Sequence, residues 1–349
     1  MGQDLSEREI RVLEVVLQAY VETAEPAGSR TVARLCGLGV SPATIRNTMA
    51  DLEEKGYLSH PHTSAGRIPT DLAYRYQVDQ LIRLPNLSRE EEDQLLRELD
   101  PMGSTTVERL IRRAASALSL LSLELGVGLA PRMEDFVLEK LELLKVSSHK
   151  VLLVATIRSG LVRTVYVDFE GDIPDDTLAS LTHLLNERLA GLTLKEIRET
   201  VPERLRDTLS DDDAVAKELL NIFLESGAEL FNWPDLAEGE ILLGRTSFLA
   251  SQPEFTSGER LKGLIELTER RDLLSEALAS RAHEGGLRIT IGGEHDQEEL
   301  SDFTLVTSEY RVGGLKGVIG IIGPTRMSYE KVIAIVDSTT SLVNRILGP

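Results

Sequence analysis

Residues 40–58 restrict the possible folds of this chain more than any other stretch. Ser41 is a favourable N-cap, Pro42 suits the first helical position, and Gly56 suits the end of a helix. Between them, apolar residues recur at helical spacing on one side, and small and polar residues gather at the start of the other. We therefore predict an amphipathic helix whose first turn and a half is free to touch a partner.

The free face of this helix is chemically suited to the major groove of DNA. Arg46 can pair bidentately with guanine, Asn47 can pair with adenine, and the small residues beside them can lie against a thymine methyl group. The N-terminus of the helix also favours a nearby phosphate. We predict a recognition helix whose expected DNA contacts are Ser41, Ala43, Thr44, Arg46 and Asn47.

The residues before this helix predict the rest of a helix-turn-helix. Ser6 and Glu9 form a capping-box pattern at the start of a helix that runs to about residue 24. A short helix is expected from Ser29 to about Leu35. The glycine-containing turn at residues 36–40 then leads into the recognition helix, which is the helix-turn-helix order.

The residues after the recognition helix predict a wing. Residues 56–60 read as a short strand, residues 61–66 as a turn-rich tip, and Arg67 begins a returning strand. Arg67 and His62 are therefore expected to reach phosphate or the minor groove. Another helix is predicted from 71 to about 83.

Two motifs stand out in this region: residues 41–47 combined with 51–58, and residues 64–70. They resemble the heat-inducible transcription repressor family, HrcA, and the similarity continues at 74–79 and more loosely beyond. The resemblance implies a homodimeric repressor of heat-shock (chaperone) operons that binds an inverted-repeat operator in double-stranded DNA. It also implies release on heat stress and support by the chaperonin GroEL. Ser64 and Arg75 match the family pattern and join the expected DNA contacts, with bracing of the wing as the alternative for Arg75.

Charge and length set the context for this domain. The chain has 349 residues, enough for two or three domains, and a net charge of −19. Residues 1–84 hold nine of the 38 basic and 11 of the 57 acidic residues, so the acidity lies outside the predicted DNA-binding domain. The single cysteine, Cys36, cannot form an internal disulfide, and no apolar run is long enough to span a bilayer. These features favour a cytoplasmic protein that is not associated with a membrane.

The remaining pattern favours an α+β fold. A helix is expected at 106–125. Strands at 135–146, 150–158 and 161–169 then read as an antiparallel meander. A mostly helical block follows, with helices expected near 175–190, 194–205, 212–229 and 257–282 and one strand candidate at 240–249. Strands at 287–292, 303–312 and 317–323 and a last helix at 329–347 end the chain, which suggests one α+β domain interrupted by an insertion. The resemblance implies that these parts are a GAF-like domain and an inserted, mostly helical dimerisation domain. The expected divisions are the winged helix 1–84, a linker 85–103, the GAF-like domain 104–171 and 286–349, and the insertion 172–285.

The helical block is rich in leucine, which offers an apolar interface for a dimer or packing within its own domain. The relevant residues are Leu178, Leu181, Leu184, Leu185, Leu219, Leu220, Ile222 and Phe223. A two-fold dimer would place two winged helices on an inverted repeat.

Enzymatic and cofactor chemistry find no support in the sequence. Residues 294–296 (Glu-His-Asp) read as a polar loop rather than a metal site, and the glycines at 313–317 lack the spacing of a phosphate-binding loop. We expect no catalytic residue, cofactor, metal or small-molecule ligand. Two alternatives to the repressor stay open: a winged-helix regulator gated by a metabolite in the GAF-like domain, and a scaffold or chaperonin client that does not bind DNA.

Overall fold

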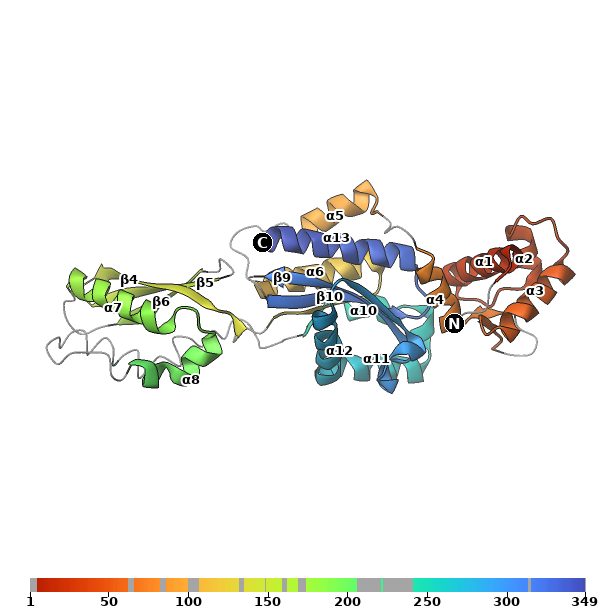
Figure 1. Ribbon diagram of the computed structural model, residues 1–349. Coiled ribbons are helices and arrows are strands. Elements are labelled where there is room, and N and C mark those ends of the chain that lie inside the picture. The colour runs from red at the N-terminus through yellow and green to blue at the C-terminus, as the bar shows by residue number, and fades with distance from the viewer. Residues whose placement is uncertain are drawn as a thin grey trace. The chain divides into compact units, whose positions relative to one another are not determined.

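Figure 1 shows the computed structural model, in which the chain divides into two compact units. The first unit comprises residues 1–128, 241–309 and 318–343, and the second comprises 129–240, 310–317 and 344–349. The residues that the structure describes are 5–61, 66–81, 86–99, 107–131, 135–147, 149–158, 162–168, 174–205, 221, 241–312 and 315–348.

The N-terminal part of the first unit is a winged helix, as the sequence predicts. Its helices and strands are α1 (Glu7–Thr23), α2 (Ser29–Leu35), α3 (Pro42–Glu54), β1 (Leu58–Ser59), β2 (Ile68–Pro69) and α4 (Asp71–Asp79). The Ser6–Glu9 capping box starts α1, and the Ser41 hydroxyl accepts a hydrogen bond from the Thr44 amide at the start of α3. α4 ends earlier than expected, and residues 82–85 lie outside the described part of the chain.

The winged helix has a compact apolar core. Ile45, Met49 and Leu52, the predicted apolar stripe of α3, are all buried against α1 and α2. Gly37 and Gly39 in the turn before α3 both have φ of +67°, a conformation that glycine adopts without strain. The packed stripe therefore orients α3 so that its other face points to solvent.

A five-stranded sheet forms the centre of the first unit. The strand order is β7-β3-β10-β9-β8, with β3 at Leu125–Leu129, β7 at Ile241–Leu243, β8 at Leu287–Ile291, β9 at Phe303–Val312 and β10 at Leu315–Pro324. β8 and β9 pair antiparallel. The helices of this domain, which we call the core domain, are α5 (Arg89–Leu99), α6 (Val107–Ser122), α10 (Thr246–Ala250), α11 (Gly258–Glu269), α12 (Arg271–Glu284) and α13 (Tyr329–Leu347). Short 3-10 turns lie at Pro253–Thr256, Gly292–Glu294 and Glu298–Leu300.

Several core elements differ from the expectation. The predicted helix at 106–125 ends at Ser122, and the buried strand β3 follows it. The candidate strand at 240–249 is a strand for three residues only and then becomes α10, and the predicted helix at 257–282 is split in two at Arg270. β3 contains Gly126 and Gly128, and glycine argues against a strand unless a neighbour comes very close. α6 is that neighbour, which local pattern alone does not reveal.

The second unit contains the predicted meander in a sheet of its own. β4 (Leu138–Ser147), β5 (Lys150–Ile157) and β6 (Val162–Asp168) pair antiparallel, and α7 (Asp175–Leu189) and α8 (Leu194–Leu205) accompany them. The Asn186 side chain of α7 bonds the backbone amide and carbonyl of Leu141, at 2.8 and 2.7 Å. Leu178, Leu181 and Leu185 are buried within the chain itself. The predicted helix at 212–229 lies outside the described residues, apart from residue 221.

This arrangement differs from the expected domain boundaries. The sequence pattern places the meander in the same domain as β8–β10, with the insertion at 172–285. In the structure β4–β6 form a separate sheet in the second unit, and residues 241–309 belong to the first. Alternation of apolar and polar residues identifies a strand but does not identify its partner, so the pattern alone does not decide which sheet a strand joins.

Candidate nucleic-acid interface

α3 presents most of the predicted DNA contacts on one exposed face. Arg46 and Asn47 are exposed, and neither side chain forms a hydrogen bond or ion pair with any residue that the structure describes. Ser41 and Ala43 are exposed at the start of the helix, and Thr44, which follows them, is partly exposed. The two longest polar side chains of α3's first turns are therefore free to meet another molecule.

α2 adds two cations that the sequence reasoning missed. Arg30 and Arg34 lie one turn apart on the exposed side of α2, whose buried residue is Val32. In a helix-turn-helix the helix before the recognition helix crosses the DNA backbone. The sequence already predicts this helix and shows its two arginines. Together they could have identified Arg30 and Arg34 as candidate phosphate contacts.

The wing is tied by backbone hydrogen bonds to the segment that joins α1 and α2. β1 and β2 pair antiparallel, and the Arg67 backbone also exchanges two hydrogen bonds with Ala27, at 2.8 and 3.0 Å. A Cβ at Gly66 would lie 2.4 Å from the Ala27 carbonyl oxygen, so only glycine fits there. The tip residues His62 and Ser64 lie outside the described part of the chain.

The Arg67 side chain lies against α3. Its Nη2 is 2.7 Å from the Glu53 carboxylate, the side chain is 19% exposed, and its Nε has no partner among the described residues. Glu53 also pairs with the His60 ring. The carboxylate of Glu53 thus joins both strands of the wing to the last turn of the predicted recognition helix.

Arg75 is directed away from α3. It lies on α4, where its guanidinium bonds Glu294 at 2.6 and 2.5 Å and the Ile289 carbonyl at 2.9 Å. The hydrogen bond with Glu294 raises the pKa of Arg75. The structure therefore brings together the predicted residues of α3, holds Arg67 against Glu53 at the end of α3, and directs Arg75 toward the core domain.

We expect the Glu53→Gln variant to loosen the wing. Loss of the charge leaves the mostly buried Arg67 guanidinium without its counter-ion, which costs about 1–3 kcal/mol. Hydrogen exchange of the Ala27 and Arg67 amides in the full-length protein should then be faster by roughly tenfold or more, because local opening governs exchange. Glu54→Gln is the matched control, since Glu54 is the exposed neighbour. Equal wing exchange in the two variants would contradict this role of Glu53.

The fold and the exposed face of α3 define a class of protein: a winged helix-turn-helix regulator joined to an α+β core domain. Residues 108–333 match the family described as HrcA protein C terminal domain. The heat-inducible transcription repressor HrcA of Chlorobium phaeobacteroides strain BS1 is 38% identical over 349 residues, which cover 97% of each protein. The repressor of the same name from Pelotomaculum thermopropionicum is 36% identical, with 98% of this chain and 97% of the relative covered. The chain belongs to the HrcA family of heat-inducible transcription repressors.

A solved structure supports the fold independently. A crystal structure described as a hypothetical protein, at 2.2 Å resolution, superposes with a TM-score of 0.70 at 20% identity and covers 99% of both chains. The family consists of transcription repressors, so the expectation that this chain is not an enzyme is confirmed. Within the described ranges, no helix is both long and apolar enough to cross a membrane.

Proposed function

We infer that this repressor binds an inverted-repeat operator in double-stranded DNA as a homodimer, with α3 of each copy in the major groove. The observation that carries this proposal is the exposed pair Arg46 and Asn47 at the start of α3, which have no partner among the described residues. Arg46 reads guanine and Asn47 reads adenine, while Ala43 and Thr44 approach thymine methyl groups. The amide-rich start of α3 at Ser41 receives a phosphate.

The other basic residues of the winged helix act on the backbone of the DNA. Arg30 and Arg34 on α2 contact phosphates and set the register of α3 in the groove. His62 and Ser64 at the wing tip reach phosphate or the minor groove. Arg67 supports the wing through Glu53 and touches DNA only with its exposed fraction. Arg75 acts as a brace, because its guanidinium is engaged by Glu294.

Repression follows from occupancy of an operator that overlaps a promoter, where the bound dimer excludes polymerase. The protein therefore works in the cytoplasm, on operators of heat-shock operons. Heat lowers the population of the binding-competent form, and the chaperonin GroEL restores it. The family membership and the relatives' name, heat-inducible transcription repressor, support repression that is relieved by heat.

The test is a binding assay with the full-length protein at fixed salt. Operators are first selected from a pool of random inverted repeats, and each is compared with a scrambled duplex, with and without chaperonin. The wild-type protein should prefer the selected duplex by ~10³-fold or more. Absence of any preference, even with chaperonin, would overturn the proposal and favour the scaffold alternative.

Two arginine variants separate base reading from backbone contact. Arg46→Ala should cost about 1–3 kcal/mol on the operator and little on the scrambled duplex, because a base contact is lost. Arg30→Ala should weaken binding to both duplexes by a similar factor, because a phosphate contact is lost. The slope of log K against log salt concentration should fall in magnitude by about one. If both variants lost affinity equally on both duplexes, α3 would not be the reading helix.

A further inference from the structure

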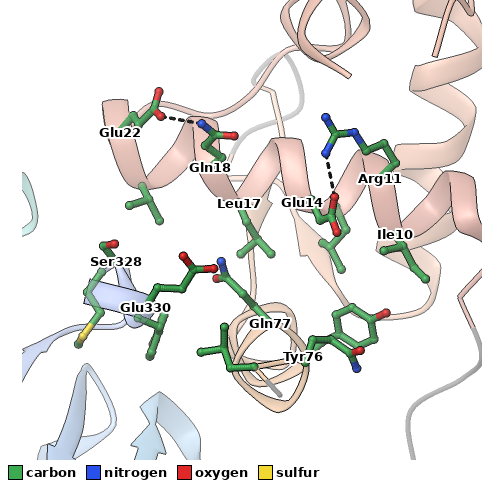
Figure 2. A pocket seen from close by; sticks show the side chains of 16 residues that line it. Ile10, Arg11, Glu14, Leu17, Gln18, Glu22, Tyr76, Gln77, Ser328 and Glu330 are labelled. Carbon is green, nitrogen blue, oxygen red and sulfur yellow. Dashed lines mark hydrogen bonds and ion pairs between the residues drawn. The ribbon is translucent and has the colours of Figure 1, made fainter. Parts of the chain in front are cut away.

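We propose that Arg326 and Arg75 are positioning residues that hold the winged helix at one angle to the core domain and thereby set the operator spacing that the dimer accepts. This inference rests on the proposed binding of an inverted repeat. It is carried by two polar clusters, one at Arg326 and one at Arg75, and by a cavity between α1, α4 and the start of α13 (Figure 2).

The first cluster ties the end of α1 to the core domain through Arg326. This residue lies between β10 and α13, and its side chain is only 10% exposed. Its Nη1 donates to the Val21 carbonyl of α1 at 2.7 Å, and its remaining nitrogens form a two-pronged pair with Glu254. Val21 lies in the last turn of α1, where carbonyls lack helical partners and a cation is favourable. The hydrogen bond with Glu254 raises the pKa of Arg326.

The same cluster continues into the core. Arg326 Nη2 also donates to Gln252 at 3.2 Å, and the Gln252 amide donates to the Leu123 carbonyl at the end of α6, again at 3.2 Å. The guanidinium is therefore held at a fixed place by the core domain, and α1 is held by the guanidinium. A planar, multiply bonded arginine restricts direction as well as distance.

The second cluster ties α4 to the turn after β8. Arg75 bonds Glu294, and Asp71, one helical turn earlier on α4, accepts a hydrogen bond from the Gly293 amide at 2.9 Å. A Cβ at Gly292 would lie 2.1 Å from the Asp71 carboxylate, and Gly292 has φ of +50°. This close approach needs glycine, so the turn is shaped to receive α4.

Aromatic packing joins α4 to the start of α13. The rings of Tyr74 on α4 and Tyr329 on α13 meet at 5.6 Å between centroids. Beside them lies a cavity of about 790 Å³, lined by Leu17 of α1, Gln77 of α4 and Glu330 of α13 among others (Figure 2). Because no side chain of the described residues fills this cavity, packing there does not resist rotation about the tyrosine pair, and the polar clusters supply the resistance.

A fixed angle between the winged helix and the core domain limits which operator spacings the dimer can occupy. One base pair of extra spacing turns a half-site by about 35° and moves it by about 3.4 Å, since the duplex repeats every 10–10.5 base pairs. Two winged helices fixed to their core domains can occupy both half-sites at only one phasing. Winged helices that rotate freely would tolerate several.

The experiment measures binding of the full-length repressor to duplexes with identical half-sites and spacers changed one base pair at a time, plus a single half-site. Wild type should prefer one spacing over its neighbours by up to ~10², the gain expected from simultaneous engagement. Arg326→Met and Arg75→Met should reduce that ratio to within roughly tenfold while leaving single half-site binding unchanged. Arg326→Lys keeps the charge but not the two-pronged geometry, so its spacing ratio should lie between that of the wild type and that of Arg326→Met.

The control is Lys262→Met, which removes an exposed cation on α11. Circular dichroism at the assay temperature establishes that each variant is folded. If Arg326→Met is unfolded, Arg75→Met alone tests the inference. A spacing profile that keeps its wild-type shape in the folded variants, with affinity lowered equally at every spacing, would overturn the inference. A wild-type protein without preference for inverted repeats would instead overturn the proposed function, so the two failures are distinguishable.

Discussion

The Glu124→Gln variant should unfold at a higher temperature than the wild-type repressor at pH 8, and the difference should shrink as the pH falls toward 5. Glu124 follows α6, is 5% exposed, and its Oε2 has no hydrogen-bond partner among the described residues. Burial raises the pKa of Glu124 to about 9, from a usual value of 4.5. The folded protein therefore keeps this carboxyl protonated under conditions where the unfolded chain ionises it.

Proton linkage gives the sign and size of the effect of Glu124 on the free energy of unfolding. Between pH 4.5 and about 9 the folded state binds a proton that the unfolded state has lost, so this group lowers the free energy of unfolding as the pH rises. At pH 7 the loss is on the order of 3 kcal/mol, at 1.36 kcal/mol per pH unit above the unfolded pKa. Glutamine has the same shape as glutamic acid and cannot ionise, so the Glu124→Gln variant does not lose this stability as the pH rises.

Thermal unfolding of both proteins at pH 5, 6, 7 and 8 measures the effect, with Glu269→Gln as the control at an exposed position of α11. The control should not reproduce the pH-dependent gain. A Glu124→Gln variant that is less stable than wild type at pH 8 would show that the carboxylate is charged and paired in the folded state. We propose that the repressor leaves its operator on heating because the binding-competent form is lost. The stabilised variant should therefore stay bound to its operator at a higher temperature than the wild type.

The second large effect is expected where α6 meets the sheet: Gly126→Ala should destabilise the core domain by about 3 kcal/mol or more, the upper range for overpacking. The new Cβ would lie 2.0 Å from the Ala115 carbonyl oxygen and 2.9 Å from the Leu118 Cβ. The Ala115 oxygen is backbone within a helix and cannot rotate away. The Ser119 hydroxyl, which accepts from the Gly126 amide at 2.7 Å, would lose its place as the helix is pushed out.

A second glycine provides the matched comparison. Gly263 lies inside α11, and a methyl group added there would have no other residue's atom within 4 Å beyond its own helix turn. Gly263→Ala should therefore stabilise the protein by about 0.5–1 kcal/mol through helix propensity. Urea unfolding of the two variants beside wild type measures both changes, and the same substitution should give opposite signs at the two sites. Equal effects would mean that α6 can move away from β3 at little cost.

The winged helix was predictable because its signals are local. The cap at Ser41, the helical spacing of Ile45, Met49 and Leu52, and the glycine turn before them each act within a few residues. The same pattern that buries one face of α3 must expose Arg46 and Asn47 on the other. For this reason the exposed face of α3 followed from the sequence without knowledge of the partner strands or domains.

Other features depended on contacts between residues far apart in the chain. The sequence identifies β4–β6 as strands, but only the three-dimensional pairing places them in a sheet separate from β8–β10. Arg67 and Arg75 have the same charge as Arg46, yet Glu53 and Glu294 occupy their guanidinium groups. The burial of Glu124 and the approach of α6 to Gly126 likewise come from packing of distant segments. Local chemistry thus determined which residues α3 exposes, and the tertiary structure decided which arginines are held by carboxylates, because an ion pair depends on which distant carboxylate the fold brings near.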